Sequence, residues 1–362
     1  MATITTPRSP EGPPATRATP SLVQGILPRW TPIAVLVGSL VVAVAVMSLV
    51  SFNLYGIGLL TFLLTLGVLT AVSRSVEGRR RGTDRMVTTL VWGAFVLAML
   101  PLVSLVWTVL DRGVPGLSSE FFTSTMRGVI GPGGGISHAI VGTLLVTGLA
   151  AVISIPIGLL AAIYLVEYGR GRLARAVTFL VDVMTGIPSI VAGLFAYALF
   201  VVFFGEGIRM GAAGSVALSV LMIPVVVRSS EEMLKLVPNE LREAAYALGV
   251  PRWRTILKVV LPTAVAGIAT GITLSIARVI GETAPLLIVA GLTAGMNTNL
   301  FSGRMTTLPV FAYTSYASPG FPPEAGNQRG WSAALVLIAI VMILNLVARV
   351  ISRLFAPKTP GR

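Results

Sequence analysis

The sequence contains no cysteine and only one histidine, His138, among its 362 residues. Without cysteine there are no disulfides, no thiolate catalysis and no cysteine-ligated metal sites, and a single histidine makes no metal site. The pattern G-x-x-x-x-G-K-[ST] is also absent. The glycine-rich GPGGG at 131–135 is not followed by Lys-Ser/Thr, so it predicts a flexible turn rather than a phosphate-binding loop. If ATP drives this protein, another chain must hydrolyse it.

Charged residues are scarce. They make up 11% of the chain, whereas hydrophobic residues make up 54%. This balance predicts an all-α integral membrane protein. A helix needs about 20 mostly apolar residues to cross a bilayer. Eight stretches meet that requirement: 30–52, 54–75, 87–110, 137–166, 174–203, 212–228, 262–291 and 331–352. The fourth, fifth and seventh are unusually long, so we expect them to be tilted, broken by glycine or proline, or extended beyond the membrane.

The positive charges are distributed unevenly between the two sides of these spans. With a cytoplasmic amino terminus, 21 of the 27 Lys and Arg residues fall in inside segments and five in outside segments, while Arg278 lies within a span. This bias follows the positive-inside rule and predicts a multi-pass protein of the plasma membrane with both termini in the cytoplasm. Topology signals beside anionic lipid explain most of the net charge of +13, which argues against nucleic-acid binding.

The spans divide into a hairpin and a larger unit. We expect a disordered cytoplasmic tail at 1–29, rich in Pro, Thr, Ser and Arg. The other expected parts are a transmembrane hairpin at 30–75, a basic cytoplasmic linker at 76–86, a six-span domain at 87–355 with a cytoplasmic loop at 229–262, and a tail at 356–362. The outside segment 292–330 is rich in Gly, Pro and Ser. It fits a plug, a lid, a docking surface or a solvated loop.

The cytoplasmic loop contains EAAYALGVPRWRTILKVVLP, from Glu243 to Pro262. It predicts a short helix, a break at Gly249, a second helix started by Pro251 and a stop at Pro262. The alanines make a slim ridge that can enter a groove on another protein, and the surrounding charges are Glu240, Arg242, Glu243, Arg252 and Arg254. An amphipathic helix lying on the membrane surface explains the same residues equally well.

This stretch resembles the EAA motif of ABC-importer permeases, E-A-A, three residues, G, nine residues, I, any residue, L-P. The matching residues are Glu243, Ala244, Ala245, Gly249, Leu261 and Pro262, with Val259 in place of isoleucine. The resemblance implies a coupling helix seated in a groove of an ATPase subunit, and it favours that reading over the surface helix. The coupling residues it implies are Glu243, Ala244, Ala245, Gly249, Pro251 and Arg252.

Three further stretches resemble phosphate-importer permeases of the PstA type: GIPSIVAGLF at 186–195, ARVIGETAPLL at 277–287, and the apolar run at 139–168. The resemblance covers about 87–355 and implies a six-helix type I importer permease core, with the amino-terminal hairpin as an addition of unknown purpose. It also implies a sister permease of the PstC type, an ATPase dimer of the PstB type that binds the ATP, and an external phosphate-binding protein of the PstS type. No cofactor is expected on this chain.

Arg278 and Glu282 lie in a predicted span, where an ionisable group costs at least ~2.5–3.5 kcal/mol unless it is paired or faces water. At i and i+4 they share one helix face, so they can neutralise each other. Alternatively, Arg278 faces an anion path, because a guanidinium suits an oxyanion, and Glu282 prevents binding that is too tight. The two interpretations are compatible, and the resemblance implies the second. Thr283 adds a hydroxyl, and Pro285 breaks the helix beside it.

Two other ionisable residues are weaker candidates. Asp182 is expected to pair with a basic residue at the cytoplasmic surface, and His138 to lie at an interface. The predicted function is one half of a phosphate pathway. The alternatives are an ABC permease for sulfate, molybdate or another solute, a membrane scaffold, and an intramembrane enzyme. The spans carry no paired aspartates or Ser/His set, which disfavours the enzyme.

Overall fold

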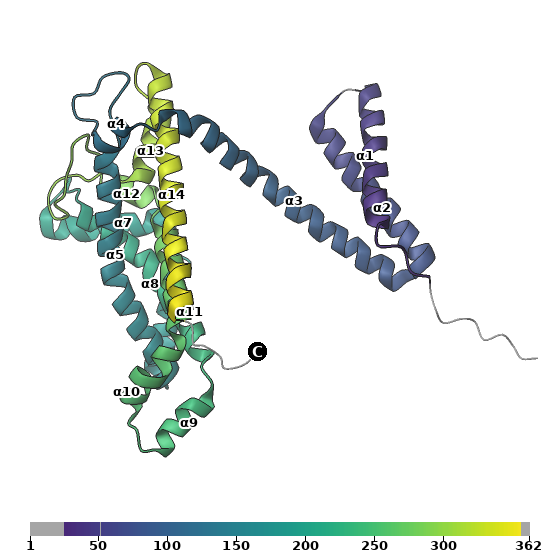
Figure 1. Cartoon of the computed structure of the whole chain (residues 1–362). Helices are drawn as coiled ribbons and strands as arrows, with labels where there is room; N and C mark the ends of the chain where they lie inside the picture. Colours follow the sequence, from purple (N-terminus) through teal and green to yellow (C-terminus); the bar gives the residue numbers. More distant parts are fainter. Residues whose placement is uncertain (1–24, 51, 356–362) are drawn as a thin grey trace, which may run out of the picture. The chain divides into compact units, whose positions relative to one another are not determined.

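The computed structural model describes residues 25–50 and 52–355 and divides the chain into two compact units, Met1–Ser104 and Leu105–Arg362 (Figure 1). The described part is helical and has seven helices long and apolar enough to cross a membrane, or eight if one bent pair counts as a span. This agrees with the eight predicted spans. The boundary between the units falls inside the helix α3 (Arg79–Gly113) rather than in the predicted linker. Most of the predicted tail at 1–29, and 356–362, lie outside the described residues.

The first unit contains α1 (Thr31–Val50), α2 (Leu54–Glu77) and the start of α3 (Arg79–Gly113). α1 and α2 form the predicted hairpin, and α2 buries one residue per turn on one face, including Thr61 and Thr65. Their hydroxyls donate to the carbonyls of Ile57 and Thr61 at 2.7 Å. Because these bonds stay inside the helix, α2 can bury threonine without leaving an unpaired hydroxyl.

The segment expected as a linker, 76–86, is almost entirely helical, because α2 ends at Glu77 and α3 begins at Arg79. Glu77 is 2% exposed, and its carboxylate accepts hydrogen bonds from Arg85 Nε at 2.7 Å, Ser73 Oγ at 2.7 Å and the backbone N–H of Leu27 at 3.0 Å. A buried carboxylate is tolerated only when it is paired and hydrogen-bonded. These bonds therefore hold the segment before α1 and the start of α3 at the end of α2.

The second unit is a bundle of four long helices, α5 (Ser137–Ile163), α8 (Gly211–Lys235), α11 (Leu261–Val279) and α14 (Pro323–Phe355) (Figure 1). Ser215 donates to the carbonyl of Val146, and Ser219 to that of Ala150, four residues further along both helices. The constant offset shows that α5 and α8 run parallel. Glycines allow the close packing, since a Cβ on Gly158 would lie 2.7 Å from Val226.

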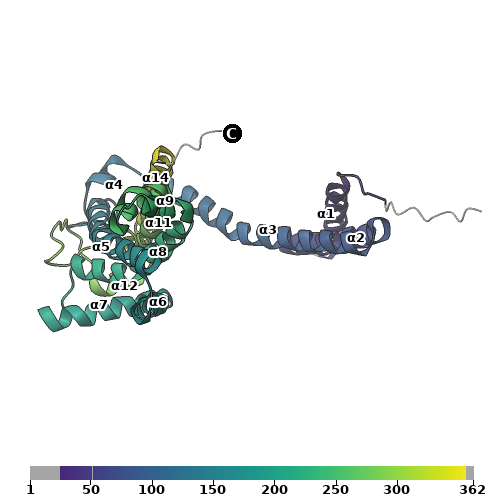
Figure 2. The ribbon, with the colours of Figure 1, turned by 90° about the horizontal axis from the view of Figure 1, so that it is seen from below.

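The long fifth and seventh spans are both broken, one of the outcomes expected for them. α6 (Arg172–Thr185) and α7 (Ser189–Phe204) make an angle of 110° (Figure 2). Pro188 directly precedes α7 and disfavours helical geometry in the residue before it. The seventh span ends with α11 at Val279, and a separate short helix, α12 (Ala284–Val289), follows.

Short elements connect the long helices. The segment before α5 contains η1 (Val114–Gly116) and α4 (Ser119–Thr123), and α13 (Leu308–Ala317) lies inside the predicted loop 292–330. Leu308 N–H donates to the buried Thr143 hydroxyl at 2.7 Å, so the start of α13 is fixed on α5. The loop is therefore a folded part of the bundle. At the other end are π-helical η2 (Tyr164–Tyr168) and η3 (Ile256–Val260), with α9 (Asn239–Ala247) and α10 (Arg252–Thr255).

Candidate functional site

The EAA stretch forms α9, a turn at Gly249 and α10 at one end of the bundle, as predicted (Figure 1). The predicted stop at Pro262 is wrong, because α10, η3 and α11 follow one another without a break over Arg252–Val279, and Pro262 lies in the first turn of α11, where proline is tolerated. Gly249 has φ +74°, a left-handed conformation that glycine adopts without strain. Its N–H donates to the carbonyl of Tyr246 at 2.9 Å, and the next N–H, of Val250, donates to that of Ala245 at 3.1 Å. These bonds satisfy carbonyls at the end of α9 and set the angle at which α10 leaves.

Five of the six predicted coupling residues are exposed: Glu243, Ala244, Gly249, Pro251 and Arg252. The sixth, Ala245, is 8% exposed and faces the bundle. Large apolar side chains are exposed beside them, with Leu248 at 83%, Trp253 at 55% and Leu257 at 56%. An exposed apolar patch with charges around it is typical of a protein or membrane interaction site.

Arg242, which the sequence suggested as one of the charges around this helix, points into the bundle instead. Its Nη2 and Nε bond to Glu167 Oε1 at 2.9 and 3.1 Å, and the side chains are only 12% and 6% exposed. Its Nη1 and Nη2 also donate to the carbonyls of Val237 at 2.6 Å and Leu234 at 2.9 Å. One guanidinium therefore joins α9 to η2 and caps the end of α8.

Sequence reasoning missed this contact. The two partners are 75 residues apart, and neither the EAA spacing nor the span pattern relates them. The one available signal was Glu167, an acidic residue at the end of an apolar run, which needs a partner if it is buried.

A second group of charges lies at the same end. Asp182 in α6 pairs with Arg228 in α8, so it has the basic partner expected of it. Arg228 also bonds to Glu231 at 2.7 Å, and Glu231 to Lys235 at 2.7 Å. Four alternating charges thus link α6 to the last turns of α8, and three of them, Asp182, Glu231 and Lys235, border a cavity of about 390 Å³.

Arg278 lies near the middle of the bundle. A Cβ on Gly271 of α11 would lie 2.6 Å from Ser229 of α8. Gly267, four residues before Gly271, lies against Met233, which is four residues after Ser229. α11 and α8 are therefore antiparallel, and this register places Arg278 level with Met222, close to the midpoint of α8. The Arg278 side chain is exposed, whereas the adjacent Val279 is 1% exposed and shares a buried cluster with Met222.

Glu282 does not share a helix with Arg278, contrary to the predicted i, i+4 pairing. α11 ends at Val279, whose carbonyl accepts the Glu282 N–H at 3.1 Å, and the described residues include no ion pair between the two side chains. The helix ends because Gly281 favours a break and Pro285 cannot donate a helical hydrogen bond. Glu282 and Thr283, both partly exposed, therefore lie in an irregular segment next to Arg278.

The break is held in place by α7. A Cβ on Gly193 would lie 2.7 Å from the Cα of Pro285, so the backbones of α7 and α12 are in direct contact there. Ala192 and Ala196 on the same side of α7 are at most 1% exposed. The GIPSIVAGLF and GETAPLL stretches, far apart in sequence, thus pack together around the segment that carries Glu282 and Thr283. His138 is 2% exposed and packs edge to face on Phe311, in agreement with its expected interface position.

Comparison with protein families gives a match over residues 154–360 to the binding-protein-dependent transport system inner membrane component family. The chain is 48% identical over 283 residues to phosphate transport system permease protein PstA 1 of Mycobacterium tuberculosis (strain ATCC 25618 / H37Rv), covering 77% of this chain and 91% of that protein. It is 40% identical over 272 residues to protein PstA of Pasteurella multocida (strain Pm70), covering 75% and 95%.

Two solved structures share the fold. The chain superimposes on a chain of a bacterial alginate ABC transporter, crystallised with an alginate pentasaccharide-bound periplasmic protein, with a TM-score of 0.54 and 13% identity over 75% of this chain and 95% of that one. An inward-facing MetNI methionine ABC transporter gives a TM-score of 0.50 and 22% identity over 67% and 100%. At these identities the likeness concerns the fold alone.

Proposed function

The chain belongs to the binding-protein-dependent transport system inner membrane component family, and from that premise we propose that it is a permease subunit importing inorganic phosphate. Relatives named as phosphate transport permeases match three quarters of the chain at up to 48% identity, which favours phosphate over sulfate or molybdate. The observation that carries the mechanism is the exposed Arg278 halfway along the bundle, without a carboxylate partner among the described residues.

Arg278 is the proposed contact for the anion. An unpaired guanidinium in a bilayer is costly, so a position at mid-depth requires a water-filled path or a counter-charge. Its planar fork of donors suits the oxygens of phosphate. Glu282, in the break beside it, limits how tightly an anion is held, because like charges repel at short range. Thr283 supplies a hydroxyl, and the irregular backbone at 280–283 is tolerated where it lines a polar cavity.

The exposed end of α9 and α10 is the proposed seat of an ATPase subunit, which binds the ATP. Binding of an ATPase subunit there places the α9–α10 end in the cytoplasm. The distribution of basic residues favours the same orientation. Both termini are then cytoplasmic and the membrane is the bacterial inner membrane. The remaining proposed partners are a second permease of the PstC type, an ATPase dimer of the PstB type and an external binding protein of the PstS type.

The test is ATP-driven uptake of radiolabelled phosphate by proteoliposomes that contain the assembled complex, comparing native protein with Arg278→Gln. We expect the variant to assemble and hydrolyse ATP but to lose most of its uptake, because only the charge in the path is removed. Arg349→Gln, at an exposed position near the end of α14, is the matched control and should transport normally.

The outcomes separate the mechanism from the cargo. Normal uptake by Arg278→Gln would reduce Arg278 to a structural residue. A native complex that hydrolyses ATP without accumulating phosphate would refute phosphate as the transported anion. Uptake of labelled sulfate or molybdate by the same vesicles would then identify another oxyanion as the substrate.

A further inference from the structure

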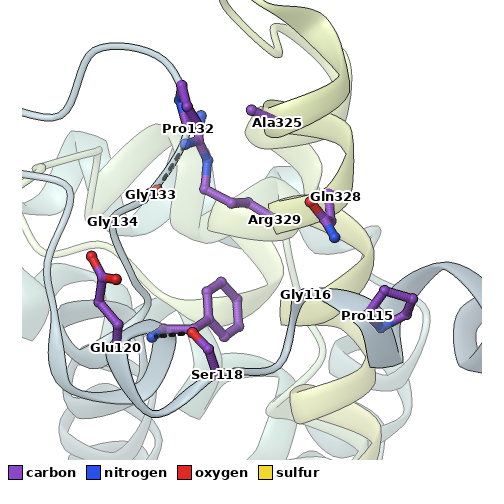
Figure 3. A pocket seen from close by; sticks show the side chains of 11 residues that line it. Pro115, Gly116, Ser118, Glu120, Pro132, Gly133, Gly134, Ala325, Gln328 and Arg329 are labelled. Atoms are coloured by element: carbon purple, nitrogen blue, oxygen red, sulfur yellow. Dashed lines mark hydrogen bonds between the residues drawn. The ribbon is translucent and has the colours of Figure 1, made fainter.

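The end of the bundle opposite α9 and α10 carries further arginines, and they differ in what they contact. The guanidinium of Arg329 in α14 is hydrogen-bonded: its Nη1 donates to the carbonyl of Gly133 at 2.9 Å (Figure 3). It also donates to the carbonyl of Gly131 at 2.7 Å. It borders a cavity of about 220 Å³, but its main role there is to hold the GPGGG turn against α14. This arginine is therefore part of the fold.

Three other arginines are placed by the backbone around one segment, 289–294, which starts at the last residue of α12. The N–H of Met210, next to Arg209, donates to the carbonyl of Val289 at 3.1 Å. The N–H of Met305, next to Arg304, donates to that of Ala290 at 3.0 Å, and the N–H of Met126, next to Arg127, donates to that of Ala294 at 3.0 Å. Arg127, Arg209 and Arg304, here called the outer arginines, are thus fixed beside the same six residues.

Gly291 brings two of them together. A Cβ at this residue would lie 3.0 Å from Arg209 Cδ and 3.3 Å from Arg304 Cγ, so both side chains pass beside the same point of the backbone. Gly291 also has φ +73°, a second reason for glycine at this position. Arg127 lies further along the segment, with its Cδ 3.9 Å from the corresponding point on Gly295.

The outer arginines have no counter-charge among the residues that the structure describes. All three are exposed, and in the described part of the chain none of their guanidinium groups forms an ion pair or a hydrogen bond. Three like charges held around one short segment repel one another, and an anion between them relieves that repulsion. Guanidinium donors match the oxygens of phosphate.

The position of this group relates it to Arg278. α12 has six residues, so it is about 9 Å long. The amino-terminal end of α12 follows the irregular segment beside Arg278, and its carboxy-terminal end, Val289, lies two residues before Gly291. Clefts lined by one sign of charge raise the local concentration of the opposite ion. We propose that Arg127, Arg209 and Arg304 form an outer receiving site for inorganic phosphate, from which the anion passes along α12 to Arg278.

This inference rests on the proposed function, because it assumes that phosphate travels toward Arg278. The experiment measures phosphate uptake by the assembled complex as a function of the concentration of phosphate-loaded binding protein. Native protein is compared with a triple variant, Arg127→Gln, Arg209→Gln and Arg304→Gln. The matched control is Arg112→Gln, an exposed arginine of the same unit that stacks on Trp331 and lies outside the group.

We expect the triple variant to lower the maximal uptake rate on the order of tenfold, with an unchanged half-saturating concentration of binding protein, and Arg112→Gln to behave as native. Substituting lysine at the three positions should restore most of the rate, because the charge is retained. Assembly and ATP hydrolysis are checked first. If the triple variant fails to assemble, Arg209→Gln and Arg304→Gln alone provide the same comparison with a smaller effect.

Three results would overturn the proposal. An unchanged maximal rate would show that the arginines do not act on the anion. A raised half-saturating concentration at an unchanged maximal rate would assign them to an acidic protein surface. An effect seen in vesicles containing phosphatidylglycerol but absent in pure phosphatidylcholine would assign them to anionic headgroups. Each differs from a failure of the proposed function, in which the native complex itself accumulates no phosphate.

Discussion

Arg242 provides the sharpest test of how the α9–α10 end is built. Replacing it with glutamine removes the charge that neutralises Glu167, whose side chain is only 6% exposed, and breaks the bonds to the carbonyls of Leu234 and Val237. Breaking a buried ion pair by removing one partner costs about 3–5 kcal/mol. For a unit of this size, about 2 °C of melting temperature is lost per kcal/mol. Arg242→Gln should therefore unfold roughly 6–10 °C below native.

The assay is thermal unfolding of the purified chain, followed by circular dichroism, in one detergent and at one protein concentration. Arg254→Gln is the matched control, because that guanidinium is exposed and stacks on Trp253 with its Cζ 5.1 Å from the ring centre. Loss of an exposed cation–π contact costs about 0.5–1 kcal/mol, so this control should stay within about 2 °C of native.

A double-mutant cycle separates the ion pair from the other bonds of Arg242. Glu167→Gln combined with Arg242→Gln leaves no uncompensated charge, so the double variant should be less destabilised than the two single losses added together, by about 1–3 kcal/mol. Arg242→Gln unfolding within 1 °C of native, or strict additivity in the cycle, would refute the conclusion that this pair holds α9 to the bundle.

Three further substitutions test other parts of the fold. Gly249→Ala should weaken binding of the ATPase subunit in a titration, since forcing a side chain into φ +74° costs roughly 1–2 kcal/mol and alters the turn between α9 and α10. Gly193→Ala should lower the melting temperature by several degrees, because overpacking against Pro285 costs about 1–3 kcal/mol. Glu77→Gln should destabilise the first unit by about 1–3 kcal/mol, since the partly exposed Arg85 loses its charged hydrogen-bond partner, with proteolysis of that unit as the measurement.

Two controls accompany these substitutions. Gly148→Ala has open space at the new methyl group and an ordinary helical φ, so it should be neutral or slightly stabilising in both glycine assays. Asp84→Asn removes an exposed carboxylate from the first unit and should leave proteolysis unchanged. If Gly148→Ala behaved like either glycine variant, or Asp84→Asn like Glu77→Gln, the explanations from backbone geometry and buried charge would be wrong.

The spans and the EAA turn could be predicted because their signals are local. An apolar run identifies a membrane helix from about 20 consecutive residues, and Gly249 followed by Pro251 identifies a turn from three. The breaks at 186–188 and 280–283 have equally local causes in glycine and proline. The pairing of Arg278 with Glu282 was wrong because a spacing of four gives one helix face only if the helix continues, and here α11 ends between the two residues.

The contacts that assemble the site are non-local, which is why sequence reasoning did not find them. Arg242 meets Glu167 across 75 residues. The outer arginines come from three segments that meet only because three backbone N–H groups bond to 289–294. A single sequence shows which charges are present and near which span they lie, but it does not show which of them the fold neutralises.

That distinction divides the charges of the second unit by function. At the α9–α10 end, the basic side chains that join helices are paired with carboxylates, Arg228 with Asp182 and Arg242 with Glu167, whereas Arg252 and Arg254 are exposed and form no ion pair in the described residues. Such pairs fix the positions of α6, α8 and α9, as the proposed coupling to an ATPase subunit requires. At mid-bundle and at the opposite end, Arg278 and the outer arginines have no such partner in the described residues. A paired arginine is neutralised by its carboxylate, whereas an unpaired one keeps its charge for a passing anion. Unpaired arginines near both ends of α12 are therefore what the proposed phosphate path needs, and the pairs that join α6, α8 and α9 are what the proposed coupling to an ATPase needs.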